Sequence, residues 1–286
     1  MTSTTHTPSP DTDAPRSWPD LRPAAGTAPA PRRRQLRALA AAEWRELLRN
    51  KVALFNSVGL PLVLGMLVLG IDGQAVPLGV FFATMVTGTA ILFVVYYTLV
   101  TAVVARREAL LLKRLRSGEA GDGTILAGIA APFVAVTLAQ FVMAAALSRV
   151  LFGTSLSPLT LVALVGVLLA AVAFAALAVA STPFTRTVEH AQITTLPIIV
   201  IPLLLSGMAV PLAVMPEPMR LVAQVLPLTP VVELIALGLG SVTVTGAPVD
   251  LAQGLVEAVR PLLVLLAWTG IALWIARATM VWEPRS

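Results

Sequence analysis

Five long stretches without a charged residue dominate the sequence and restrict what it can fold into. They lie at residues 52–71, 73–105, 123–148, 150–185 and 191–216. The hydrocarbon core of a bilayer is about 30 Å thick and takes about 20 apolar residues in a helix, so each stretch can cross it. Charged residues make up 12% of the chain, about half the share of a soluble domain. A soluble fold of this composition would expose large apolar patches, so the sequence predicts an all-α integral membrane protein.

Allowing for loops, these stretches predict membrane-spanning helices at residues 52–71, 77–104, 124–148, 159–182 and 191–212. A sixth span, at 261–276, reaches about 20 residues only if Glu257 and Arg260 extend their charges to the interface. Six spans place both termini on the same side of the membrane, and 17 of the 20 Lys and Arg residues fall on that side. Because positively charged loops stay in the cytoplasm, both termini are expected to be cytoplasmic.

The regions outside the spans predict a four-part organisation. Residues 1–31 are rich in Pro, Thr and Ser, so we expect a disordered cytoplasmic tail. Residues 32–51 place apolar residues on about half of a helical wheel, which predicts an amphipathic helix at the membrane interface. The alternative for 32–51 is a charge cluster that only fixes the first span. Residues 52–277 form the six-span domain, and 278–286 form a second cytoplasmic tail.

The loop after the second span predicts a docking element for a soluble partner. Glu108, Leu111, Leu112 and Leu115 share one face of a short helix over residues 108–116, whereas Arg107, Lys113 and Arg114 point away from it. The glycines after residue 116 end this helix. A short amphipathic helix under the membrane, with a carboxylate on its apolar face, can bind a groove of another protein.

Residues 215–256 predict a re-entrant segment on the outer side, between the fifth and sixth spans. Two apolar pieces, 219–226 and 231–239, are each too short to cross the bilayer and are interrupted by prolines. Backbone at membrane depth must be buried in protein, so we expect both pieces to dip into the outer leaflet packed against the spans.

Small polar residues form stripes in two of the spans. Thr84, Thr87, Thr98 and Thr101 lie within about 100° of one another on a helix that advances about 100° per residue. Thr195 and Ser206 share a face of the fifth span in the same way. Such stripes line a substrate path or allow close packing at a dimer interface. The alternative is that each hydroxyl bonds a carbonyl of its own helix.

Several kinds of chemistry are missing from the sequence. It contains no G-x-x-x-x-G-K-[ST] phosphate loop, no cysteine and only two histidines, so we expect no ATPase site and no metal centre in this chain. The middle of each of the first five predicted spans has no ionisable residue, which argues against an ion-driven carrier. We therefore expect a protein that is not an enzyme and that takes its energy from elsewhere.

The layout resembles the membrane subunits of ABC type-2 transporters. The resemblance covers residues 34–277 and rests on the order of three patterns. A basic amphipathic lead-in enters the first span through Leu48-Arg49-Asn50-Lys51 and Leu60-Pro61. Residues 107–116 are similar to the family's charged coupling segment. The stretch 205–211, followed by Met215-Pro216 and by 226–230, is similar to its fifth-span signature.

This resemblance implies an export permease of the plasma membrane that works as a homodimer, or as a heterodimer with a sister chain. A separate ATP-binding cassette subunit would bind ATP and Mg, so no cofactor is expected in this chain. Glu108, Leu111 and Leu115 would dock on that ATPase, with Arg107 and Arg114 beside them. Membrane lipid is the other expected partner, and nucleic acid is not one.

Two further classes are weighed against the exporter. A membrane scaffold or regulator would use the basic inner face to recruit anionic lipid or a cytosolic protein. A lipid-modifying enzyme would need acidic or metal-binding clusters, whereas Asp72, Glu189, Asp250 and Glu257 are isolated in the sequence.

Overall fold

The computed structural model describes residues 32–49, 51, 55, 59–67, 76–112, 121–212 and 215–280, all within the compact unit Pro31–Ser286. Most of these residues are helical, and apart from an isolated bridge between Val242 and Pro248 they form no β-structure. The predicted tail 1–31, much of the predicted first span and residues 281–286 lie outside the described ranges. Of the predicted first span, the structure describes mainly α3 (Leu60–Leu67).

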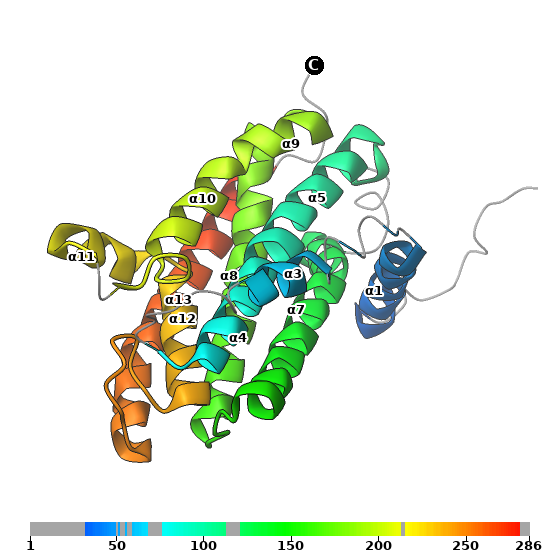
Figure 1. The fold of residues 1–286 in the computed structure, drawn as a ribbon. Coiled ribbons are helices and arrows are strands. Elements are labelled where there is room, and N and C mark those ends of the chain that lie inside the picture. Colours follow the sequence, from blue (N-terminus) through cyan, green and yellow to red (C-terminus); the bar gives the residue numbers. More distant parts are fainter. Residues whose placement is uncertain are drawn as a thin grey trace, which may run out of the picture. The chain divides into compact units, whose positions relative to one another are not determined.

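Five helices are long and apolar enough to cross a membrane, and they match the second to sixth predicted spans (Figure 1). The first consists of α4 (Leu78–Thr89), the π-helix η3 (Ala90–Tyr97) and α5 (Thr98–Glu108). The next two are α7 (Asp122–Phe152) and α8 (Leu159–Ser181), the latter extended by η4 (Thr182–Phe184). Then come α9 (Val188–Thr194) with α10 (Leu196–Leu205), and finally α13 (Leu251–Thr279).

The last of these helices begins ten residues before the predicted start of the sixth span, so residues 251–256 are helical and continuous with that span. Asp250 accepts a hydrogen bond from the backbone N–H of Gln253, and the Gln253 side chain accepts one from the backbone N–H of Asp250. This capping box satisfies backbone donors that a helix start otherwise leaves unpaired. The charged residues Glu257 and Arg260 are therefore inside α13 and not at its end.

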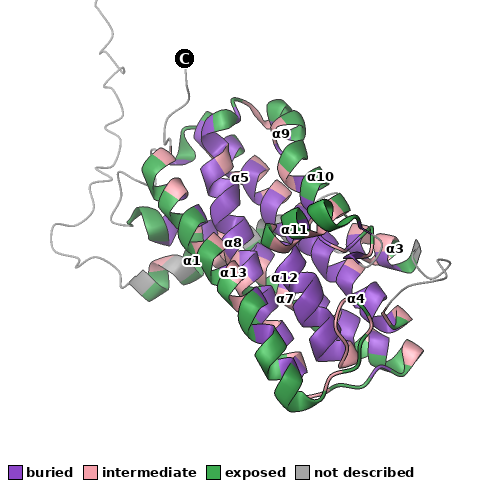
Figure 2. Ribbon diagram, turned by 90° about the vertical axis from the view of Figure 1, so that its left-hand side faces the viewer, coloured by how far each residue is buried: buried purple, intermediate pink, exposed green. Residues whose placement is uncertain are grey.

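The helix Leu78–Glu108 forms the centre of the bundle. In its most apolar window 83% of residues are buried, compared with 22% for Val188–Leu205 and 22% for α13. Figure 2 shows burial concentrated along α4, α5 and α8, with exposed residues along α9, α10 and α13. The exposed apolar faces of α10 and α13 are therefore available for lipid or for another membrane chain.

The segment between the fifth and sixth spans consists of α11 (Glu217–Val225), α12 (Thr229–Ile235) and η6 (Ala236–Gly240). α11 and the α12–η6 piece are bent by 89° at their junction, in agreement with the two short helices expected here. Its depth in the membrane stays a prediction. The indole of Trp268 on α13 donates to the carbonyl of Val225 at 2.8 Å and holds the end of α11.

The α12–η6 piece packs closely on α8 because two glycines leave room. A Cβ at Gly238 would lie 2.7 Å from the Ala163 Cβ and 3.0 Å from the Leu159 carbonyl oxygen, and a Cβ at Gly166 would lie 2.3 Å from Leu234. The carbonyl of Gly238 also accepts a hydrogen bond from the Thr160 hydroxyl at 2.7 Å. The bent pair is thus fixed to the bundle by backbone contact.

The N-terminal segment forms α1 (Arg32–Arg49), as predicted. It packs on α7, where a Cβ at Gly128 would lie 2.7 Å from the Leu39 Cβ. Trp44 is exposed on this helix. Whether α1 lies on the membrane interface stays a prediction.

Candidate coupling and translocation sites

The chain turns sharply where the central helix ends. The helix α5 stops at Glu108, and Leu110 takes a positive φ of 56° before helical structure resumes at Leu111. The N–H of Leu110 donates to the carbonyl of Arg107 at 3.1 Å and closes this turn. The predicted helix over 108–116 is therefore wrong at its start, because a helix cannot continue through a left-handed residue. We call Glu108–Leu112 the coupling turn.

The coupling turn presents a different set of side chains from the predicted one. Glu108 and Leu111 are exposed as expected, and Leu110 is exposed beside them. Leu112 is fully buried, with 0% exposure compared with 41% for Leu111, so these two leucines do not share a face. The turn at Leu110 separates them and would not be visible from helical spacing. Arg114 and Leu115 lie outside the described residues.

Arg107 points into the protein, so it is not presented beside the exposed Glu108 and Leu111, where it was expected to help dock the ATPase. Its side chain is 2% exposed. The guanidinium donates to the carbonyls of Thr182 at 2.9 Å, Thr185, and Arg186 at 3.1 Å. Thr182 begins η4, and Thr185 and Arg186 follow it, so all three carbonyls lie in the connection after α8. A planar group with five donors can satisfy several of them together.

The threonines of the central helix do not form one continuous stripe. Thr84 and Thr87 are buried on α4, whereas Thr98 and Thr101 are half-buried on α5. The π-helix η3 lies between the two pairs, and its i→i+5 hydrogen bonds change the rotation per residue on which the predicted stripe depends.

Three of these four hydroxyls bond their own helix, which is the alternative left open by the sequence. Thr84 donates to the Val80 carbonyl at 2.8 Å, Thr98 to that of Phe93 at 2.8 Å, and Thr101 to that of Thr98 at 2.8 Å. The Thr87 hydroxyl is buried and has no hydrogen-bond partner among the described residues.

In the fifth span, the two small polar residues of the predicted stripe lie on the buried side. Thr195 and Ser206 are both buried, as are Ile199 and Pro202 between them on the same side. The Thr195 hydroxyl donates to the Ala191 carbonyl at 2.6 Å. The Ser206 hydroxyl has no hydrogen-bond partner within the part of the chain that the structure describes. Just beyond this face, Met208 packs on the central helix, where a Cβ at Gly88 would lie 2.2 Å from its sulfur.

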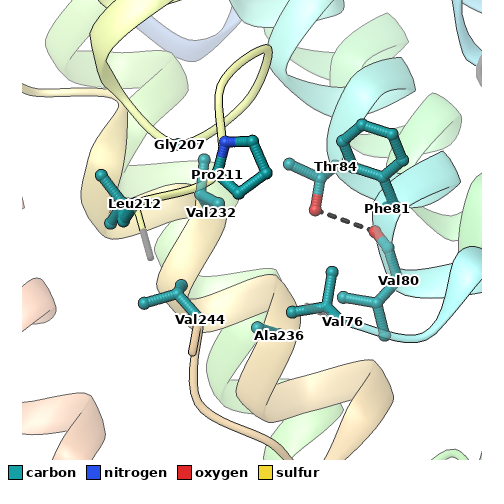
Figure 3. A pocket seen from close by; sticks show the side chains of 10 residues that line it. All are labelled: Val76, Val80, Phe81, Thr84, Gly207, Pro211, Leu212, Val232, Ala236 and Val244. Carbon is teal, nitrogen blue, oxygen red and sulfur yellow. Dashed lines mark hydrogen bonds between the residues drawn. The ribbon is translucent and has the colours of Figure 1, made fainter. Parts of the chain in front are cut away.

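A small cleft, with an enclosed volume of about 20 Å³, lies between the central helix, the end of the fifth span and the bent pair. Thr84 is one of its lining residues, so we call it the Thr84 cleft (Figure 3). The dashed line in Figure 3 shows that the Thr84 hydroxyl is already bonded to the Val80 carbonyl. The remaining lining residues are apolar or Gly, which suits an apolar group: Val76, Val80, Phe81, Gly207, Pro211, Leu212, Val232, Ala236 and Val244.

An ion pair joins the bent pair to the last span. The carboxylate of Glu233 on α12 accepts a hydrogen bond from the guanidinium of Arg260 on α13. The Glu233 side chain is 10% exposed and that of Arg260 is 50% exposed. The prediction of 231–239 as an apolar piece misses this pair. The signal was available, since a lone acid in an apolar helix at membrane depth needs a partner.

The described residues contain no group of three or more His, Cys, Asp or Glu side chains that could hold a metal ion.

Comparison with known families gives one match. Residues 34–239 match the model of the family described as ABC-2 type transporter. No match is found among curated proteins. The matched range includes α1, the coupling turn, the Thr195–Ser206 face and most of the bent pair.

Proposed function

Because the chain belongs to the ABC-2 type transporter family, we propose that it is the membrane subunit of an exporter driven by a separate ATPase subunit. Family membership and five helices long enough to cross a bilayer make it a multi-pass membrane protein. Members of the family generally work with a separate ATPase. The further proposals concern the direction of transport, the docking site for that ATPase, and the location in the plasma membrane with both termini cytoplasmic.

The observation that carries this proposal is the coupling turn. It places the exposed side chains of Glu108, Leu110 and Leu111 at the end of the most buried helix of the bundle. An exposed carboxylate beside exposed leucines suits a groove with a positive rim on another protein. A push on this turn acts directly on the central helix, because Glu108 is the last residue of α5.

The cargo route in this proposal runs along the central helix and the fifth span. The Thr84 cleft lies between them and is lined almost entirely by apolar residues, which supports an apolar or amphipathic cargo. The exposed apolar faces of α10 and α13 support a second permease subunit, identical or related, with lipid covering the rest. Thr87, Thr195 and Ser206, all buried within the chain, are the proposed polar positions along this route.

The test is replacement of Glu108 by alanine, in cells that also express the partner ATPase of this chain. We expect Glu108→Ala to insert normally and to reduce both copurification of the ATPase and ATP-dependent transport. The size of the loss should be about 10-fold, because a charge-assisted contact at an interface contributes about 1.5 kcal/mol or more. Copurification is measured by pull-down from detergent, and transport by efflux of a panel of lipophilic dyes.

Glu217→Ala is the matched control. Glu217 is an exposed acid at the start of α11, 4.0 Å from Arg220, and lies far along the chain from the coupling turn. This variant should keep full copurification and transport. If wild-type protein binds no ATPase with a phosphate loop, the scaffold or regulator alternative replaces the exporter. If Glu108→Ala behaves like Glu217→Ala, the coupling turn is not the docking site.

A further inference from the structure

The buried guanidinium of Arg107 connects the coupling turn to a different part of the bundle. Arg107 directly precedes Glu108, and its three acceptor carbonyls lie on the connection Thr182–Arg186 between the fourth and fifth spans. A second contact supports the same junction: the Tyr96 and Ser181 hydroxyls are 3.0 Å apart. The central helix is therefore fastened to the end of α8 at two levels.

The contacts continue from this connection into the fifth span. The hydroxyl of Thr185, whose carbonyl accepts from Arg107, lies 2.8 Å from the hydroxyl of Thr194 on α9. Thr187 caps the start of α9 by accepting a hydrogen bond from the backbone N–H of His190 at 3.4 Å. The position of α9 thus depends on the short connection that Arg107 holds.

The fifth span in turn forms part of the Thr84 cleft. Helix α10 follows α9 after a single residue, Thr195, and ends at Leu205. Gly207 and Pro211, which come directly after it, line the cleft. One series of contacts therefore runs from the coupling turn through Arg107, Thr185 and Thr194 to the cleft wall.

We propose that Arg107 is a positioning residue that transmits the displacement of the coupling turn to the fifth span. This inference rests on the proposed function, since the displacement is supplied by the ATPase. Burying a guanidinium is costly, and a helix end can be capped with a glycine or asparagine instead. An arginine that reaches three carbonyls of another segment ties two elements together, which neither of those caps can do. Lysine would keep the charge but not the planar fork that meets several acceptors.

The test uses distances between spin labels in the complex with the ATPase. The chain has no cysteine, so labels can be placed at single introduced cysteines. Ala105→Cys reports the end of α5, Ile193→Cys reports α9, and Leu156→Cys in the connection between α7 and α8 is the shared reference. All three positions are exposed. Protein labelled at only one position gives the distances between labels on different copies of the chain, which are the background. Each pair is measured without nucleotide and after trapping with Mg-ATP and vanadate.

In the wild-type complex, we expect both the 105–156 and the 193–156 distances to shift on trapping. In Arg107→Met and Arg107→Lys, the 105–156 shift should remain while the 193–156 shift is largely lost. Thr194→Val keeps Arg107 but removes the contact between the Thr185 and Thr194 hydroxyls, and it should also reduce the 193–156 shift. Arg277→Met, at an exposed arginine in the last turn of α13, should behave like wild type.

The outcomes separate the two proposals. If neither distance shifts in wild type, the proposed function fails, and this inference with it. If only the 105–156 distance shifts in wild type, or if both shifts survive in every Arg107 and Thr194 variant, the exporter assignment stands and the transmitting role of Arg107 is wrong. A lower melting temperature in the Arg107 variants, with both shifts intact, likewise assigns Arg107 a purely structural role.

Discussion

At the scale of single residues, the charged side chains that matter most are the buried ones. Arg107 and Glu233 both lie inside the bundle, and each contacts a segment that is distant in sequence. Removing one member of a buried pair leaves an uncompensated charge, whereas replacing both members with apolar residues is often tolerated. For the Glu233–Arg260 pair, a single variant should therefore lose more stability than the double variant.

We expect Glu233→Ala to lower the free energy of unfolding by about 1–3 kcal/mol, the range for hydrogen bonds to charged groups. This loss of stability should be smaller than the loss from breaking a fully buried pair, because half of the Arg260 side chain is exposed. The double variant Glu233→Met, Arg260→Met should recover most of the loss. Unfolding in mixed detergent micelles measures all three, and additive losses in the double variant would show that the two residues do not interact.

The exposed pair Glu217 and Arg220 on α11 provides the control for this cycle. At 4.0 Å on the surface, it should contribute less than about 1 kcal/mol. The same pair of substitutions made there should leave the free energy of unfolding almost unchanged.

At the scale of elements, the helices were predictable and their junctions were not. The spans followed from charge-free stretches, because membrane burial requires an apolar residue at nearly every position of a local segment. The turn at Leu110 and the π-helix Ala90–Tyr97 have no comparable local signal. The burial of Arg107 depends on carbonyls more than 70 residues away, which no helical wheel includes. Helical spacing therefore misplaced Leu112, which is buried, and gave no sign that Arg107 is buried.

The junction between the bent pair and α8 can be tested with a glycine. Gly238→Ala places a Cβ against the Leu159 carbonyl oxygen and the Ala163 Cβ, neither of which is the end of a flexible side chain. We expect it to lower the free energy of unfolding by about 1–3 kcal/mol, as overpacking does in other cores. Thermal unfolding monitored by circular dichroism in detergent provides the measurement.

Gly270→Ala is the matched control within α13, because nothing lies within 4 Å of the Cβ that it adds. It should leave stability unchanged or raise it by up to about 1 kcal/mol, as expected for alanine over glycine in a helix. Equal effects at the two positions would mean that η6 does not pack closely on α8.

At the scale of the whole molecule, the described helices have two distinct ends. The coupling turn and the connection Thr182–Arg186 meet at one end through Arg107. At the other, the Ser148 hydroxyl donates to the Gly79 carbonyl at 2.7 Å, and Thr160 donates to Gly238. The distribution of Lys and Arg predicts that the first end is cytoplasmic.

Labelling of single cysteines in this cysteine-free chain tests that orientation. In intact cells, a membrane-impermeant maleimide should modify Leu156→Cys and Thr245→Cys but not Leu111→Cys or Glu189→Cys. All four positions are exposed. The last two should react only after the cells are opened. The reverse pattern would place the coupling turn outside the cell and remove the exporter mechanism.

The central helix contributes residues to both candidate sites. It runs for 31 residues from Leu78 to Glu108, a length of about 45 Å. Val80 and Phe81 at one end border the cleft, and Glu108 at the other belongs to the turn. Linkage is reciprocal for equilibrium binding. If nucleotide binding to a partner ATPase changes the affinity of the cleft for a cargo molecule, that cargo must change the nucleotide affinity by the same factor. Cargo would then act as an allosteric effector of the ATPase.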